Sequence, residues 1–353
     1  MRIAIITQPL ISNYGGLLQN WALQTVLRRE FPGVDVVTFD QVDSVAPLYL
    51  RIGSAVKHIF WSNKDKNNVC SQFDSFRDKN IAATYKARTF SDFKKLDRIY
   101  APDVYIVGSD QVWRPSMVFN LDANFLAFTQ CHCKIAYAAS FGIDTWEFTP
   151  SQTLRCRNLI KDFTAVSVRE KDGIGLCSDY LGREACLVLD PTLLLLEEDY
   201  ARLIQGNPVD GEDYVFTYIL DSDSEKRVFV NSLIGNLPER NAAHNMLGDM
   251  PQVRPSVEEW LSAIRNASMV ICDSFHGAAF SIIFNKDFYV LGNQQRGNSR
   301  LNSLLSLFGL SDRLVESEQA AKRLSPIDWQ QVNCCHRRLI NKSLSFLQSA
   351  LCT

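Results

Sequence analysis

Short apolar runs recur along the first half of the chain, and most are followed by a polar turn and a segment with helical spacing. In residues 17–29, apolar positions three and four residues apart predict an amphipathic helix. The predicted strands are Ile3–Ile6, Val34–Phe39, Val104–Gly108, Ile135–Ala139 and Ala165–Val168. Because helix-length segments separate most of them, the strands should pair in parallel in an α/β fold.

The same rhythm restarts after about residue 175. Its predicted strands are Leu187–Leu189, Val215–Leu220, Met269–Cys272 and Phe288–Leu291. Ser256 and Glu259 fit a capping box that opens a helix. The pattern predicts two Rossmann-like domains facing a cleft, residues 1–175 and 176–325, with a terminal helix over 326–353. Residues 44–98 are polar with weak periodicity, which predicts a helical excursion or a mobile flap inserted in the first domain.

Composition narrows the class of protein. The chain has 353 residues, more than one hydrophobic core usually serves, which supports two domains. A formal net charge of −2 gives no electrostatic reason to expect nucleic acid as a partner. The first apolar run is too short for a signal peptide, and no segment has the length of a membrane span, so we expect a cytoplasmic protein.

Ten cysteines should then remain reduced. Two clusters, residues 131–133 and 334–336, bring cysteine and histidine together. Neither has the C-x-x-C spacing and matching second pair of a structural zinc site, so we expect no metal.

The turns that follow strands are the places to look for chemistry, because open α/β sheets bind ligands beyond the carboxyl ends of their strands. The strongest is Asp273-Ser274-Phe275-His276-Gly277, where a buried strand runs into a helix of small residues. His276 would lie at the helix start, where free N–H groups and the helix dipole favour an anion. A histidine there could be neutral when the site is empty and protonated when an anionic substrate binds, as a general acid requires. The alternative is a structural histidine packed against the strand.

Three arginines follow other predicted strands. Arg296 and Arg300 could grip a phosphate, or could simply be solvated in a polar loop. Arg169 could hold an anion, or could form an ion pair with Glu170.

Two further turns contain small polar residues. Ser109, Asp110 and Trp113 follow Val104–Gly108 and resemble a sugar-contacting turn, in which Asp110 could accept a proton from a hydroxyl; alternatively, Ser109 and Asp110 cap a helix. Asn13, Gly15 and Gly16 would let the backbone approach a ligand closely. Because no G-x-G-x-x-G or Walker sequence is present, a dinucleotide or ATP has little support.

Taken in order, these segments resemble the polysaccharide pyruvyl transferase family. The segments that carry the resemblance are residues 13–19, 106–113, 137–142, 166–170, 190–192 and 273–277. The resemblance implies a GT-B-like fold. It also implies transfer of a pyruvyl group from phosphoenolpyruvate to a sugar diol, giving a cyclic ketal and phosphate without a cofactor.

The resemblance also suggests roles for the candidate residues. His276 would be the acid and Asp110 would serve the acceptor, together with Asn13, Gly15, Gly16, Ser109 and Trp113. Several family members carry an arginine shortly before the histidine, where this chain has Ser274 and Phe275. The donor anion is therefore assigned to Arg169, with Arg296 or Arg300 as substitutes and Ser274 and Gly277 nearby.

Two other functions fit the same pattern. A GT-B-type nucleotide-sugar glycosyltransferase could use the same histidine and arginines for a diphosphate. A carbohydrate-binding or assembly protein could keep the fold without catalysis. The acceptor sugar is left open, as is the oligomeric state. A lipid-linked acceptor would bring the protein to the inner face of the membrane, through residues 44–98.

Overall fold

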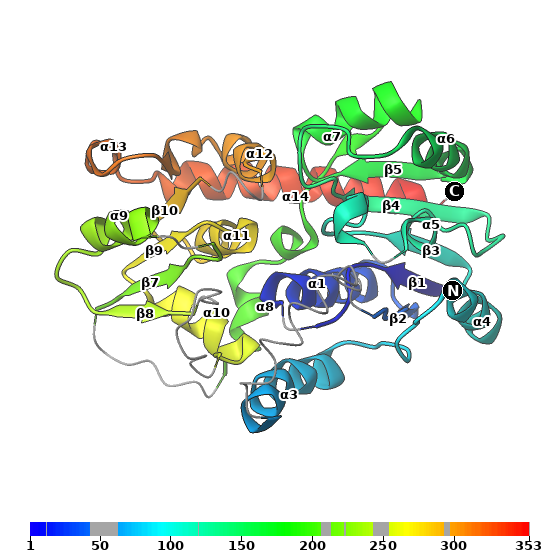
Figure 1. Ribbon diagram of the computed structural model, residues 1–353, viewed down its shortest axis with the longest axis horizontal. Helices are drawn as coiled ribbons and strands as arrows, with labels where there is room; N and C mark the ends of the chain where they lie inside the picture. The colour runs from blue at the N-terminus through cyan, green and yellow to red at the C-terminus, as the bar shows by residue number, and fades with distance from the viewer. Residues whose placement is uncertain are drawn as a thin grey trace. The chain divides into compact units, whose positions relative to one another are not determined.

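The computed structural model describes residues 1–11, 13–42, 63–118, 120–205, 213–221, 224–242, 254–292 and 297–352, with the backbone alone over 63–71 (Figure 1). The chain divides into two compact units. The first comprises Met1–Leu194 and Ile340–Thr353, and the second comprises Leu195–Leu339.

A parallel sheet of six described strands forms the centre of the first unit, in the order β2-β1-β3-β4-β5-β6. The strands are β1 (Arg2–Ile6), β2 (Asp35–Thr38), β3 (Val104–Val107), β4 (Cys133–Ala139), β5 (Ala165–Val168) and β6 (Cys186–Leu187). The near-continuous apolar strands fit a sheet that is covered on both faces.

Alternate strand residues point to opposite sides of this sheet, so both faces present apolar side chains. Helices cover both faces. One face carries Tyr105 and packs in a core with α4 (Phe90–Tyr100), α6 (Pro150–Leu159) and α7 (Lys171–Leu176). Of the other helices, α1 (Tyr14–Glu30) lies against β2. Helix α14 (Trp329–Leu351) brings the Phe346 ring into contact with Tyr137 of β4.

The insertion predicted at 44–98 contains helices where it is described. These are α3 (Asn63–Asn80) and the start of α4, which Thr89 and Asp92 open with a capping box. Between them, Ala83 and Ala87 form parallel bridges to Thr38 and Gln41. Residues 43–62 lie outside the described part of the chain.

The second unit has a parallel sheet of five described strands in the order β11-β10-β9-β7-β8. The strands are β7 (Val215–Tyr218), β8 (Glu239–Asn241), β9 (Met269–Cys272), β10 (Phe288–Leu291) and β11 (Leu314–Val315). The helices are α8 (Glu197–Ala201), α9 (Ser224–Ile234), α10 (Val257–Asn266), α11 (Phe275–Ile283), α12 (Ser299–Phe308) and α13 (Glu318–Lys322). The α/β class is therefore confirmed, with helices around two parallel sheets.

Two local predictions can be compared with the structure. The capping box is confirmed, because Ser256 Oγ accepts from the Glu259 N–H at 3.1 Å and Glu259 Oε2 accepts from the Ser256 N–H at 2.7 Å. The strand predicted at Leu187–Leu189 was wrongly placed in the second half. Its counterpart β6 pairs with β5 and extends the first sheet.

Candidate functional site

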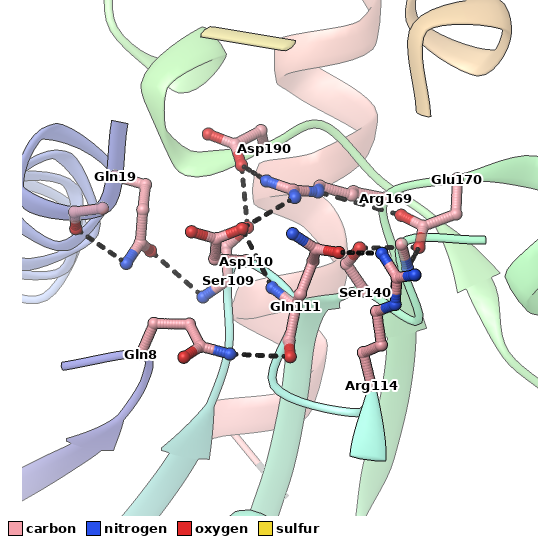
Figure 2. Close-up of polar contacts among 12 residues, drawn as sticks. Gln8, Gln19, Ser109, Asp110, Gln111, Arg114, Ser140, Arg169, Glu170 and Asp190 are labelled. Atoms are coloured by element: carbon pink, nitrogen blue, oxygen red, sulfur yellow. Dashed lines mark hydrogen bonds and ion pairs between the residues drawn. The ribbon is translucent and has the colours of Figure 1, made fainter. Parts of the chain in front are cut away.

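Polar side chains gather where β3, β5 and β6 end, at the carboxyl edge of the first sheet (Figure 2). Asp110 follows β3, Arg169 follows β5, and Asp190 follows β6. The carboxyl ends of parallel strands share one edge, so residues far apart in sequence meet there.

Arg169 is the centre of this group. Its side chain is completely buried, with Nη1 2.8 Å from Asp190 Oδ2 and Nη2 3.0 Å from Asp110 Oδ1. A third carboxylate, that of Glu170, lies 3.8 Å from Nε. Burial lowers the pKa of the guanidinium, but the three carboxylates outweigh burial and raise that pKa above its ordinary value. The ion pairs with Asp110 and Asp190 are shorter than the predicted pair with Glu170. The predicted contact of Arg169 with the donor anion stays a prediction.

The Asp190 carboxylate is held by three residues, Arg169, Ser109 and Thr192. Its Oδ2 accepts from Ser109 Oγ at 2.7 Å, and its Oδ1 accepts from Thr192 Oγ1 at 2.7 Å and from the Thr192 N–H at 3.0 Å. Ser109 also donates its backbone N–H to Gln19 Oε1 at 3.1 Å. The predicted candidate Ser109 is therefore part of the network that fixes the exit of β3.

A second set of contacts extends the network past β4. Glu170 Oε1 accepts from Ser140 Oγ at 2.7 Å and from the Gly142 N–H at 2.9 Å. Figure 2 also shows Gln111, whose side-chain oxygen accepts from Arg114 Nη1 at 3.1 Å. The edge thus holds amide, guanidinium and carboxylate groups that are mostly buried and bonded to one another.

The structure assigns local roles to the other predicted acceptor residues. Asn13 is the N-cap of α1, where its side chain accepts from the Gly16 N–H at 3.2 Å. Gly15 and Gly16 are buried in the first turn of that helix. Whether these three residues contact an acceptor stays a prediction.

The sugar contact predicted for Trp113 is wrong for this structure. Its side chain is fully buried, its ring stacks on Phe125 with centroids 5.0 Å apart, and its Nε1–H donates to Asn124 O at 3.2 Å. A ring enclosed in the core presents no surface to a ligand.

His276 lies in the first turn of α11, at the carboxyl edge of the second sheet. Ser274 caps that helix by accepting the Gly277 N–H at 2.8 Å. A Cβ at Gly277 would lie 2.8 Å from Cys272 Cβ, so glycine allows α11 to pack directly on β9. The half-buried His276 ring meets the Phe275 ring edge-on, with centroids 5.2 Å apart.

Asp273 ties this turn to the exit of β7. Its Oδ1 accepts from the Leu220 N–H at 2.6 Å, and its Oδ2 accepts from the Asp221 N–H at 3.3 Å. Lys226 Nζ, on α9, lies 2.9 Å from the same Oδ2. The sequence pattern does not single out Lys226, because a lysine early in a helix is usually solvated.

Of the two remaining candidate arginines, the structure describes only Arg300. Arg296 lies outside the described residues. Arg300 is half-buried in the first turn of α12, which follows β10. Its contact with a donor stays a prediction.

Two negative observations apply only to the described residues. There, no three histidine, cysteine, aspartate or glutamate side chains are arranged to hold a metal ion. In the same ranges, no helix combines the length and apolar character needed to cross a bilayer.

Comparison with known proteins identifies the family of this chain. A family model described as polysaccharide pyruvyl transferase matches residues 13–295. A comparison with curated protein sequences found no match.

Among solved structures, a UDP-N-acetylglucosamine 2-epimerase is similar with a TM-score of 0.55 and 12% identity, over 98% of this chain and 95% of that one. The UDP-GlcNAc 2-epimerase of Neisseria meningitidis has a TM-score of 0.50 and 10% identity, over 98% and 100%. The glycotransferase of kitacinnamycin has a TM-score of 0.50 and 12% identity, over 99% and 97%. At these identities the likeness concerns the fold, and the predicted GT-B-like class is confirmed.

Proposed function

Because the chain belongs to the polysaccharide pyruvyl transferase family, we propose that it moves a pyruvyl group from phosphoenolpyruvate to two hydroxyls of one sugar in a polysaccharide or glycan precursor. The products are a cyclic pyruvate ketal and phosphate. The family match over residues 13–295 is the observation that carries the proposal.

The reaction needs an acid at the donor, and His276 is the proposed one. Protonation of the methylene carbon of phosphoenolpyruvate turns it into a methyl group and leaves C2 cation-like. One sugar hydroxyl attacks C2, phosphate leaves with the electrons of its C–O bond, and the second hydroxyl closes the ring. A positioned general acid typically contributes about 10²–10⁴-fold to such a rate.

The donor's negative charges are proposed to lie by the second sheet. His276 is in the first turn of α11, where N–H groups and the helix dipole favour an anion. Ser274 and Gly277 shape that turn, and Arg300, with Arg296, would supply guanidinium groups for the phosphate.

The acceptor is proposed to lie by the first sheet, where Asp110 would take the proton of an attacking hydroxyl. Arg169 would position Asp110, because its guanidinium holds both Asp110 and Asp190. Its predicted contact with the donor anion is kept as part of the proposal. Asn13, Gly15, Gly16 and Ser109 are the remaining proposed acceptor residues. If the acceptor is lipid-linked, the protein would work at the membrane surface.

Release of phosphate from phosphoenolpyruvate tests the proposal directly. Wild-type protein and His276→Ala would be compared with a panel of galactose- and mannose-containing acceptors. We expect release that requires both an acceptor and His276.

If no acceptor supports release, calorimetric titration with phosphoenolpyruvate is decisive. Measurable binding would mean that the panel lacks the right sugar. No binding to phosphoenolpyruvate, with thermal stabilisation by nucleotide sugars, would overturn the proposal in favour of a glycosyltransferase. Near-normal release by His276→Ala would overturn the acid assignment alone.

A further inference from the structure

We infer that the outer face of the Tyr180 ring is a binding platform for a sugar ring of a glycan chain, outside the polar network at the carboxyl edge of the first sheet. The inference rests on the proposed function in taking a glycan as the partner. It adds a surface that the chemistry of pyruvyl transfer does not itself use.

Tyr180 is the outer ring of a three-ring stack in the first unit. The Trp146 ring lies nearly parallel to Phe148, with centroids 4.2 Å apart, and nearly parallel to Tyr180, with centroids 4.5 Å apart. Two rings at these distances cannot share one face of Trp146, so they cover its opposite faces. Phe148 is buried in the core, whereas Tyr180 keeps 41% of its surface exposed. One face of the Tyr180 ring is therefore covered by Trp146, and the other is open to solvent.

The stack is held in place from two helices. Trp146 Nε1 donates to Thr153 Oγ1 of α6 at 2.8 Å, which fixes the middle ring. Tyr180 lies in a π-helical turn, Cys177–Leu181, that continues α7. Turns of this kind occur frequently at functional sites. A ring that is fixed before its partner arrives loses little conformational freedom on binding.

Arg157 places hydrogen-bond donors beside this stack. It follows Thr153 by one turn of α6, so the two side chains lie on the same face of the helix. Its guanidinium lies against Gly182, where an added Cβ would be 3.1 Å from Nη2. Within the described ranges the Arg157 guanidinium forms no hydrogen bond or ion pair, whereas Arg155 of the same helix pairs with Asp122. The Arg157 N–H groups are therefore available to a ligand.

An aromatic face beside such donors suits a sugar. A pyranose has an apolar face of C–H groups that can pack on an aromatic ring, and a rim of hydroxyl oxygens that can accept from a guanidinium. A single exposed tyrosine would need no explanation. The Tyr180 ring differs because two further rings support it and an available guanidinium lies nearby.

The stack is close enough to the polar network to serve the same glycan. Gly142, whose N–H donates to Glu170, precedes Trp146 by only four residues. Over that length the chain spans at most about 14 Å. Tyr180 would thus hold a sugar of the acceptor other than the one that receives the pyruvyl group.

Glycan binding in the absence of phosphoenolpyruvate tests the inference separately from transfer. Calorimetry compares wild-type protein with Tyr180→Ala, using galactose and mannose oligosaccharides and the methyl glycosides of the same sugars. We expect Tyr180→Ala to weaken the oligosaccharide Kd about 10-fold or more, a typical loss for an aromatic anchor, and to leave methyl glycoside binding unchanged. Tyr180→Phe keeps the ring and should bind normally. Arg157→Met should also weaken oligosaccharide binding, and Arg155→Met is its matched control.

The outcomes separate this inference from the proposed function. Wild-type oligosaccharide affinity in a folded Tyr180→Ala protein would overturn the inference and leave pyruvyl transfer intact. Failure of wild-type protein to bind any of the oligosaccharides would also overturn it. Binding that depends on Tyr180 would support the inference even if phosphoenolpyruvate did not bind and the proposed donor had to be abandoned.

Hydroxyl-radical footprinting of the wild-type protein keeps the test independent of how the variants fold. Oxidation of Tyr180 is measured by mass spectrometry with and without oligosaccharide, beside that of the exposed Tyr85. Protection of Tyr180, with unchanged oxidation of Tyr85, supports the inference. Equal oxidation of Tyr180 at saturating oligosaccharide would contradict it.

Discussion

Loss of the Arg169 guanidinium should strongly destabilise the first unit, because its side chain is completely buried among carboxylates. Arg169→Met would leave the carboxylates of Asp110, Asp190 and Glu170 buried without their cation. We expect the free energy of unfolding to fall by about 3–5 kcal/mol, the usual cost of breaking a buried pair. Urea denaturation measures this fall. Arg114→Met removes a partly exposed pair with Glu147 and should cost less than about 1 kcal/mol. Equal effects of the two changes would contradict the prediction.

Asp40 should make stability depend on pH in an unusual direction. Burial raises the pKa of its carboxyl, although the N–H groups of Leu10 and Gln41 and the charge of Lys86 oppose the shift. A raised folded pKa means that the stability from this group is present below the unfolded pKa of about 3.9 and is lost as pH rises through the folded value. The carboxylate is therefore a cost at neutral pH.

Asp40→Asn removes that cost, since Asn Oδ1 can still accept from the Leu10 and Gln41 N–H groups. The Tm of the variant minus that of wild-type protein should increase between pH 4 and pH 7, by an amount that corresponds to about 1 kcal/mol or less. Thermal unfolding at both pH values measures the difference. A difference that shrinks over this range would show that Asp40 is stabilising when ionised.

At the residue scale, the sequence predicts which polar residues follow strands better than it predicts the contacts of their side chains. Ser109, Asp110 and Arg169 could be predicted to share an edge, because each follows an apolar run and such runs pair in parallel. The burial of Trp113 could not be predicted, because only the packed core shows which face of a turn an aromatic ring takes. Lys226 was missed because its partner Asp273 is distant in sequence and is reached only through the pairing of β7 with β9.

At the scale of elements, the junction of β9 with α11 depends on one glycine. Gly277→Ala would place Cβ 2.8 Å from Cys272 Cβ and 2.9 Å from Ser274 Oγ. Overpacking of this kind costs about 1–3 kcal/mol, and we also expect lower turnover because His276 would shift with the helix.

Gly175→Ala is the matched control, because it also lies in a helix but its Cβ would meet nothing within 4 Å. Alanine there should stabilise the protein by about 0.5–1 kcal/mol. Thermal unfolding together with phosphate release measures both variants. A Gly277→Ala protein as stable and active as Gly175→Ala would show that the junction tolerates separation.

Strands with strong apolar runs were predictable, and short ones were not. The runs at β1, β3, β4 and β9 are buried on both faces and stand out in the sequence. By contrast, β11 has two residues, and β8 has the polar sequence Glu239–Asn241, so neither gives a periodic signal. The first helix begins at Tyr14, three residues before the predicted start, because Asn13 caps it.

At the scale of the whole molecule, α14 is shared between the units, with residues from Ile340 onward belonging to the first. Ser343 on this helix accepts the Leu189 N–H at 3.0 Å, just before Asp190. Ser343→Ala would leave that buried N–H without this acceptor and should cost about 1–3 kcal/mol.

The exposed Ser345 lies on the same helix, and its hydroxyl donates to Asn341 O within that helix. Ser345→Ala should therefore change stability by less than about 0.5 kcal/mol. Urea unfolding of the two variants checks the contrast. Equal stabilities would mean that the Leu189 contact adds little to the attachment of α14.

The first unit is built from both ends of the chain, so the ribosome must make residues 195–339 before that unit can be completed. At about 5–20 residues per second, those residues take roughly 7–30 seconds. During that interval Tyr137 and Leu189 lack the side chains of α14 that contact them in the finished protein. The nascent chain therefore exposes apolar surface until its final helix emerges, and its yield in cells should depend on chaperones that bind such surface during translation.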